Sequence, residues 1–142
     1  MRGSAPPPVP APGPPAIGVR GVVVGHGDMA RGLVTAVTRI AGAQDGVLAA
    51  VSNEGRGPDE LRATILAEVG EGPGVVFTDL GAGSCTLAAR LLCRERSRVA
   101  VVTGVNLPML LEFVFHRDME LAPLLERLQA RARDGIRVVA GG

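Results

Sequence analysis

Residues 17–27, IGVRGVVVGHG, are the stretch that decides how this chain folds. Ile17 to Val24 is short and rich in β-branched residues, which is typical of a buried strand. The strand is followed by Gly25-His26-Gly27, a turn sequence that holds a histidine between two glycines. We therefore expect a buried strand that delivers His26 to its carboxyl end.

The rest of the chain alternates between apolar strands and helices. Further strands are expected at residues 47–51, 74–78 and 99–103. Helical spacing runs through residues 29–40, with Asp28 as a plausible N-cap and Gly42 as a C-cap. Other helices are expected over residues 59–69, after Ser84, from the loop at residues 104–108 to about His116, and over residues 121–133.

This order of elements predicts a single α/β domain over residues 17–142. Strands that alternate with helices form right-handed βαβ units, so the sheet is expected to be doubly wound, mainly parallel and covered by helices on both faces. We expect the strand order 2-1-3-4, and Ile136 to Val139 is a candidate for a fifth, antiparallel strand. Residues 1–16 contain seven of the eleven prolines and are predicted to be a disordered leader.

Composition excludes several classes of function. The net charge of +1 gives no electrostatic case for binding nucleic acid or an anionic membrane surface. All fifteen basic residues are arginine, so a Walker A phosphate loop and a Schiff-base enzyme, which both need lysine, are ruled out. With three phenylalanines as the only aromatic residues, stacking on bases is nearly excluded as well.

The cysteines and the hydropathy pattern point to a cytoplasmic protein. Cys85 and Cys93 lie eight residues apart, share a helix face and cannot reach each other, so both are expected to be buried, unreactive thiols. No signal peptide or membrane-spanning run is apparent. The two histidines lack metal-ligand spacing, so no metal site is predicted.

Three sequence features fall where an open parallel sheet binds its ligands, at the carboxyl ends of the strands. His26 follows the first strand, and Asp79 follows the third. In the order 2-1-3-4 these strands are neighbours, so His26 and Asp79 are expected to face each other. A carboxylate that accepts one ring N–H leaves the other ring nitrogen free to attack phosphorus. Ser84, at a helix start, is expected to donate to phosphate oxygens.

Other residues at this edge are candidates for binding. They are Gly25, Gly27, Gly81, Gly83 and, in the loop after the fourth strand, Asn106. His116 is expected near a helix C-terminus in a structural, solvated role. A receiver-like domain phosphorylated on Asp79 is disfavoured, because the chain lacks the required acidic cluster and lysine. A small-molecule module in which His26 only lines a pocket remains an alternative.

Three segments in order resemble the enzyme IIA component of the mannose-family phosphotransferase system (PTS). They are residues 22–27, VVVGHG; residues 75–84, VVFTDLGAGS; and residues 104–112, GVNLPMLLE. The third segment is the most specific, and the resemblance extends from about Val19 to about Arg133. The second segment departs from the family pattern, which often has Gly-Gly-Ser-Pro where this chain has residues 82–85, AGSC.

The resemblance implies a cytoplasmic phosphocarrier. In that family the histidine at the position of His26 accepts phosphate from the carrier HPr and passes it to an enzyme IIB component during sugar uptake. Asp79 corresponds to the orienting aspartate and Ser84 to the nearby serine. The family is typically a homodimer that exchanges a C-terminal strand, for which Ile136 to Val139 is the candidate. No cofactor or metal is expected. A regulatory carrier or partner-binding protein that is not coupled to transport is the alternative.

Overall fold

The sheet forms from the apolar segments that the sequence indicated. The computed structural model describes residues 18–142, and within them four parallel strands lie in the order β2-β1-β3-β4, as predicted. Most of their side chains are β-branched or small, which suits strands covered on both faces. The strands are β1 (Arg20–Gly25), β2 (Leu48–Ser52), β3 (Gly74–Thr78) and β4 (Val99–Thr103).

Five helices connect and follow these strands in the described part of the chain. They are α1 (Met29–Ala41), α2 (Pro58–Val69), α3 (Ser84–Glu95), α4 (Leu107–Phe115) and α5 (Leu121–Asp134). Gly42 caps the C-terminus of α1 as expected, by donating its N–H to the Thr38 carbonyl. Asp28 lies at the predicted N-cap position, but its carboxylate pairs with Arg31 instead of the helix backbone. None of these helices has the length and hydropathy that crossing a bilayer requires.

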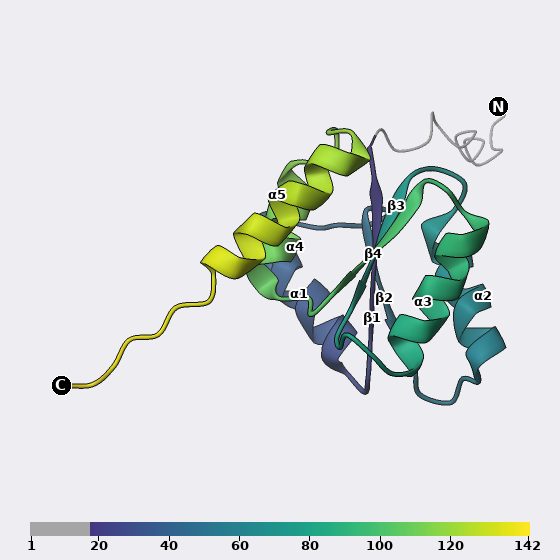
Figure 1. Ribbon diagram of the computed structural model, residues 1–142, viewed down its shortest axis with the longest axis horizontal. Helices are drawn as coiled ribbons and strands as arrows, with labels where there is room; N and C mark the ends of the chain where they lie inside the picture. Colours follow the sequence, from purple (N-terminus) through teal and green to yellow (C-terminus); the bar gives the residue numbers. More distant parts are fainter. Residues whose placement is uncertain (1–17) are drawn as a thin grey trace, which may run out of the picture.

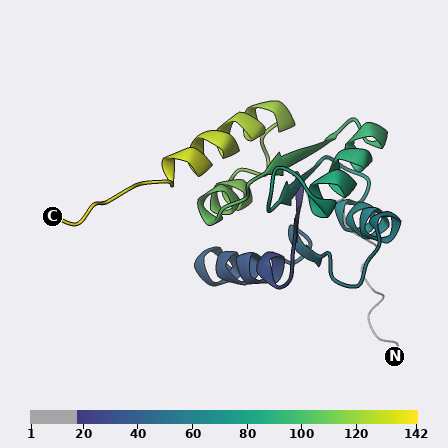
Figure 2. The same cartoon turned by 60° about the horizontal axis from the view of Figure 1, so that its bottom comes forward.

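The helices divide into two layers, one on each face of the sheet (Figure 1). Helices α1, α4 and α5 cover one face around Val23, Val75 and Phe77, and α2 and α3 cover the other around Val22 and Val76. Alternate residues of β1 and β3 therefore enter opposite cores, as the two-residue period of a strand requires. Figure 2 shows the same two layers from a second direction. The helices cover both faces of the sheet and leave the ends of the strands uncovered.

The expected fifth strand is absent from the described residues. Ile136 to Val139 continue beyond α5 as an extended segment that makes no ladder pairing, and Figure 1 shows it leaving the body of the domain. Val138 and Val139 are 92% and 93% exposed. A strand needs a partner edge, and within one chain the direction of α5 carries this tail away from the sheet.

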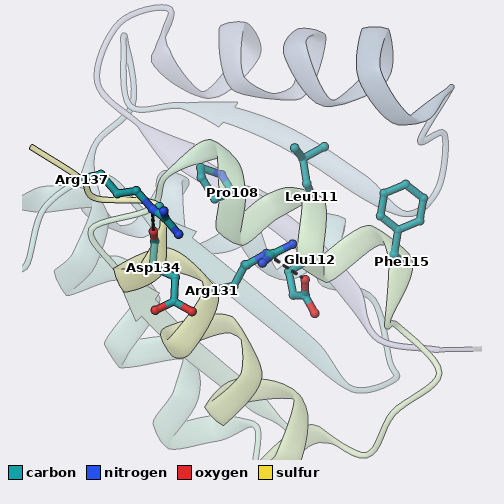
Figure 3. Close-up of a pocket in the computed structure, with 8 residues that line it drawn as sticks. Pro108, Leu111, Glu112, Phe115, Arg131, Asp134 and Arg137 are labelled. Atoms are coloured by element: carbon teal, nitrogen blue, oxygen red, sulfur yellow. Dashed lines mark hydrogen bonds and ion pairs between the residues drawn. The ribbon is translucent and has the colours of Figure 1, made fainter. Parts of the chain in front are cut away.

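A charged cluster joins α4 to α5 beside a cavity of about 510 Å³ (Figure 3). The Glu112 carboxylate accepts a hydrogen bond from Arg127 and lies within ion-pair distance of Arg131 and His116. Burial alone would raise the pKa of Glu112, but the bond from Arg127 and the charges of His116, Arg127 and Arg131 lower it overall. Two arginines of α5, Arg127 and Arg131, therefore hold this helix to α4.

Gly21 in β1 leaves room for the ring of Phe113, so a methyl group at position 21 is predicted to lower the stability of the fold. A Cβ at this position would lie 2.6 Å from Phe113 Cε2 and 2.8 Å from Leu48 Cδ1. We expect Gly21→Ala to lower the free energy of unfolding by about 1–3 kcal/mol through overpacking. Denaturant unfolding checks this, with Gly32→Ala in α1 as the matched control, because a Cβ there meets nothing within 4 Å. Equal stability of the two variants would contradict this packing argument.

The Glu112 cluster predicts a pH-dependent contribution to stability. Because the folded-state pKa of Glu112 is lowered, its carboxylate stabilises the fold above the ordinary glutamate pKa, and this is lost as the pH falls through the folded-state value. We expect Glu112→Gln to cost about 1 kcal/mol at pH 7, since both arginine partners are about half exposed. The difference from wild type should vanish in acid, as measured by urea unfolding across pH. A difference in unfolding free energy that stays the same at every pH would show that the charge of Glu112 does not contribute to stability.

Candidate functional site

The strand order brings two chemically active loops together. Strands β1 and β3 are hydrogen-bonded neighbours, and Val24 of β1 is paired with Thr78 of β3. His26 and Asp79 follow these paired ends directly, so residues 53 positions apart in the sequence meet at the carboxyl edge of the sheet. The juxtaposition expected from the order 2-1-3-4 is therefore present.

His26 and Asp79 are joined twice through the same carboxylate oxygen. The ring atom Nδ1 lies 2.6 Å from Asp79 Oδ2, and the backbone N–H of His26 donates to that oxygen at 3.0 Å. With Nδ1–H as the donor, the other ring nitrogen, Nε2, carries the free lone pair. The His26 side chain is 48% exposed, whereas the Asp79 side chain is only 7% exposed. A buried carboxylate therefore fixes the orientation of a half-exposed ring.

The environment keeps Asp79 ionised. Burial opposes the charged form and would raise the pKa of Asp79, but hydrogen bonds from the side chain and backbone of His26 outweigh it. The pKa of Asp79 consequently lies below the usual aspartate value. Its second oxygen, Oδ1, accepts the N–H of Leu80 at 3.0 Å. Asp79 is therefore a fixed negative charge that can orient the ring and balance a positive charge on it.

A buried threonine pair fixes the loop between β3 and α3. Thr86 Oγ1 lies 2.7 Å from Thr78 Oγ1, and it also donates to the carbonyl of Leu80. Both threonines are fully or almost fully buried. This link ties the first turn of α3 to the end of β3 and so sets the direction of Asp79. Thr86 was not predicted from the sequence, although a polar residue within an apolar helix face was a signal that could have identified it.

The first turn of α3 lies beside the His26 ring. Gly83, just before the helix, has a φ of +106°, and a Cβ there would lie 4.0 Å from His26 Cε1. Glycine is favoured here by this positive φ, which other residues rarely adopt. The N–H groups of the next three residues, which include Ser84, have no partner within the helix. Ser84 is exposed at this helix start, where the sequence placed it.

The other predicted glycines surround the same site with different constraints. Gly27 has a φ of +58°, which favours glycine, whereas a Cβ at Gly25 would lie 3.6 Å from Asp79 Oδ2, an ordinary van der Waals distance. A Cβ at Gly81 would meet nothing within 4 Å. The turn around His26 therefore depends on Gly27 for its conformation, while Gly81 leaves open space.

Asn106 has a structural position instead of one beside His26. Its side-chain oxygen accepts the N–H of Met109 at 3.0 Å and caps α4. Its amide nitrogen donates to the Ala132 carbonyl in α5, also at 3.0 Å. Both polar atoms are thus occupied in joining the two helices. His116, as predicted, ends α4, where its Nδ1 lies 2.9 Å from the Glu112 carbonyl oxygen.

Cys85 is the residue near the site that sequence analysis undervalued. It is buried as expected, but its Sγ lies 3.9 Å from His26 Nδ1. Burial raises the pKa of the thiol, the charge of Asp79 raises it further, and a hydrogen bond with Ser84 acts in the opposite direction. Cys93 is half-buried two turns further along α3, and both cysteines are free thiols. His26, Asp79 and Cys85 thus form one cluster.

This cluster lies on an accessible edge and not in a deep cavity. The cavity between α4 and α5 is lined by other residues, among them Pro108, Phe115 and Asp134 (Figure 3). A half-exposed imidazole with one nitrogen bonded to a buried carboxylate can act as a nucleophile or as a proton carrier. Its exposure favours reaction with a group presented on the surface of another molecule.

Comparison with known proteins identifies the family of this chain. Residues 21–129 match the family model EIIA-man, described as PTS system fructose IIA component. The chain is 30% identical over 122 residues to the PTS system fructose-specific EIIA component of Bacillus subtilis (strain 168). That alignment covers 82% of this chain and 84% of that protein.

Solved structures agree with this assignment. The phosphotransferase system component EIIA from Streptococcus agalactiae superposes with a TM-score of 0.79 at 25% identity, over 84% of this chain and 96% of that one. The mannose/sorbose-specific IIA subunit from Enterococcus faecalis shares the fold, with a TM-score of 0.76 at 22% identity over 88% and 97% of the two chains. The chain therefore belongs to the EIIA-man family, the mannose-type IIA components of the PTS.

Proposed function

We propose that this chain is a phosphohistidine carrier, which accepts a phosphoryl group from HPr on His26 and passes it to an enzyme IIB component. The observation that carries the proposal is the 2.6 Å contact between His26 Nδ1 and Asp79 Oδ2, which leaves Nε2 as the free nucleophile on a half-exposed ring. Membership of the family supports the identity of the two partner proteins. In this role the protein acts in the cytoplasm during sugar uptake.

The chemistry follows from the state of the ring. With its proton on Nδ1 and donated to Asp79, the neutral imidazole attacks phosphorus through the Nε2 lone pair. A P–N bond forms at Nε2 while the bond from phosphorus to the donor's leaving group breaks. The ring becomes positively charged, and the Asp79 carboxylate 2.6 Å away stabilises that charge. Attack by the acceptor then reverses these steps and regenerates neutral His26.

The phosphoryl oxygens would be bound by the start of α3. The first turn of α3, which has N–H groups without helical partners and begins with Ser84, follows Gly83 directly, and a Cβ on Gly83 would lie 4.0 Å from His26 Cε1. A helix N-terminus favours an anion through these donors and through its dipole. Gly81 leaves space for a partner backbone in this loop, because a Cβ there would meet nothing within 4 Å, while Gly25 and Gly27 shape the turn that carries the ring. Asn106 would contribute indirectly, by fixing the neighbouring loop.

The surface around the ring fits a protein donor better than a small molecule. Leu80 and Leu87, which flank the loop that carries Asp79, are 58% and 56% exposed. Exposed apolar side chains next to a reactive group are common where proteins dock. Arg90 and Arg94 lie with Leu87 along one shallow pocket on α3, and they add positive charge to this surface. We infer that both partner proteins dock here in turn.

We also propose that the chain is a homodimer that exchanges its C-terminal tail. Strand β4 is an edge strand of the described sheet, so one side of its backbone has no ladder partner. Residues 136–139, IRVV, are extended and apolar except for Arg137, and Ile136 already lines a shallow pocket with Thr103 of β4. Burial of Val138 and Val139 against a second copy would remove two almost fully exposed apolar side chains from water.

The carrier role predicts acid-labile, base-stable labelling at a single histidine. Incubation with labelled phosphoenolpyruvate, enzyme I and HPr should place phosphate on the wild-type chain. His26→Ala should abolish the label, whereas His116→Gln, which changes the only other histidine, should keep it. Loss of the label on acid treatment identifies the P–N bond. Undiminished label on His26→Ala would exclude His26 as the carrier.

The orienting role of Asp79 predicts a kinetic defect without loss of the fold. Asp79→Asn keeps the shape of the side chain but removes the charge that stabilises the positive ring. We expect phosphoryl transfer from phospho-HPr to slow by about 10²–10⁴-fold. Asp28→Asn is the matched control, since Asp28 lies two residues from His26, is highly exposed and pairs only with Arg31. Rapid-quench measurement of both variants decides the matter, and equal rates would contradict the role of Asp79.

The exchanged tail predicts that one charge can separate the subunits. Val138→Asp should shift the protein from dimer to monomer, because a buried, unpaired carboxylate would oppose the contact. Light scattering coupled to size-exclusion chromatography measures the mass, with Arg137→Gln as a control that changes the same tail without adding an acidic group. A wild-type chain that is monomeric at micromolar concentration would refute the exchange.

A further inference from the structure

Three potential metal ligands meet at the site in a way the carrier mechanism does not use. His26 Nδ1, Asp79 Oδ2 and Cys85 Sγ all lie within 4.8 Å of one another. Nitrogen, carboxylate oxygen and thiolate sulfur are the three donor types that zinc binds in proteins. Phosphoryl transfer requires the first two of these side chains but gives the thiol no task.

We propose that this cluster binds a zinc ion through His26, Asp79 and Cys85, and that the ion switches off phosphorylation of His26. Binding of the ion rests on the cluster alone, whereas the switch rests on the carrier function proposed above. The regulator would be the free divalent ion, bound reversibly with water in the fourth position. Catalytic-type zinc sites have this composition of three protein ligands and one exchangeable ligand.

The distances suit a small adjustment into a tetrahedral site. Zinc-to-ligand lengths of about 2.0–2.3 Å place neighbouring ligand atoms about 3.3–3.6 Å apart. The separation of Cys85 Sγ from His26 Nδ1 is 3.9 Å, close to that range. Nδ1 and Asp79 Oδ2 are 2.6 Å apart because a proton joins them, and they would separate slightly when the ion replaces that proton. The half-exposed His26 side chain has the freedom to make this movement.

The position of Cys85 explains why the thiol can be a ligand although the residue is 1% exposed. Cys85 is in the first turn of α3, and its sulfur faces the ring and the carboxylate of the same cluster. An ion that approached along the exposed His26 ring would reach Nδ1, Oδ2 and Sγ together. The thiol loses its proton to solvent when zinc binds, as metal coordination by cysteine requires.

Zinc and phosphate would exclude each other through the tautomer of one ring. Coordination uses the Nδ1 lone pair, so the ring proton moves to Nε2, which then has no lone pair for attack on phosphorus. Conversely, phosphorylation at Nε2 leaves the proton on Nδ1 and prevents coordination. The ion also neutralises the Asp79 charge that would stabilise the phosphorylated ring. By linkage, zinc lowers the equilibrium constant of phosphorylation by the same factor by which phosphorylation lowers the affinity for zinc.

Zinc binding is tested directly with the full chain and the metal alone. Titration of Zn²⁺ in competition with a chelating dye should give one ion per chain. Cys85→Ser should weaken binding by at least about tenfold, since it removes one of three ligands. Cys93→Ser, which changes the other free thiol on the same helix, should bind as wild type does. Unchanged affinity of Cys85→Ser, or equal losses in both variants, would overturn the site.

A spectroscopic readout does not depend on the folding of any variant. Co²⁺ bound to the wild-type chain should give a thiolate-to-cobalt charge-transfer absorption, which zinc then removes. Absence of this absorption at saturating Co²⁺ would show that Cys85 is not a ligand and would overturn the proposal. Prior phosphorylation of the chain should suppress the same absorption.

The regulatory step is measured by single-turnover transfer from isolated phospho-HPr to a zinc-loaded or chelator-treated chain. A zinc concentration just sufficient to load the wild type should abolish its transfer, and at that concentration the suppression should be much weaker in Cys85→Ser relative to its own zinc-free rate. Transfer that proceeds unchanged on the zinc-saturated chain would overturn the switch. Zinc binding that depends on Cys85 in a chain that never accepts phosphate would refute the carrier function and leave the metal site standing.

Discussion

The hydrogen bonds from His26 to one oxygen of Asp79 are the interaction on which the site depends. They connect the loops after β1 and β3, and they set the ring's tautomer and direction. The bonds also keep Asp79 ionised, although its side chain is only 7% exposed. A buried carboxylate costs free energy unless it is fully bonded, so the site and the fold at this edge are stabilised by the same contacts.

The supports of this interaction lie in the sheet and in α3. Parallel pairing of β1 with β3 fixes the spacing of the two loops, and the Thr78–Thr86 link fixes the turn that carries Asp79. Gly83 then lets the helix start approach the ring. The same geometry that leaves Nε2 free brings the Cys85 sulfur close to Nδ1, so the nucleophile and the candidate metal site use the two nitrogens of one ring. A phosphocarrier of this design would respond to metal without needing a second domain.

Much of the fold could be predicted because its signals are local or follow from general rules. The apolar runs predicted both ends of β3 and of β4 correctly. The alternation of strands with helices predicted a parallel sheet, which has the expected order 2-1-3-4. The fifth strand was wrong for the single chain, since a strand's existence depends on a partner edge that no local pattern reveals. Asn106 was placed among the binding residues, yet its amide is occupied by Met109 and Ala132, a contact set by the packing of α5 on α4.

By itself, the sequence determined the alternating elements, the place of His26 and Asp79 at strand ends, and the family motifs. These depend on side-chain periodicity and on the rule that parallel strands end at one edge. Only the tertiary structure decided which side chains from distant segments lie within hydrogen-bonding distance of each other. It showed one carboxylate oxygen serving both the ring and the backbone of His26, Thr86 bracing the loop, and the Cys85 thiol facing the ring. Such contacts join distant segments, and the packing of helix on sheet sets their distances.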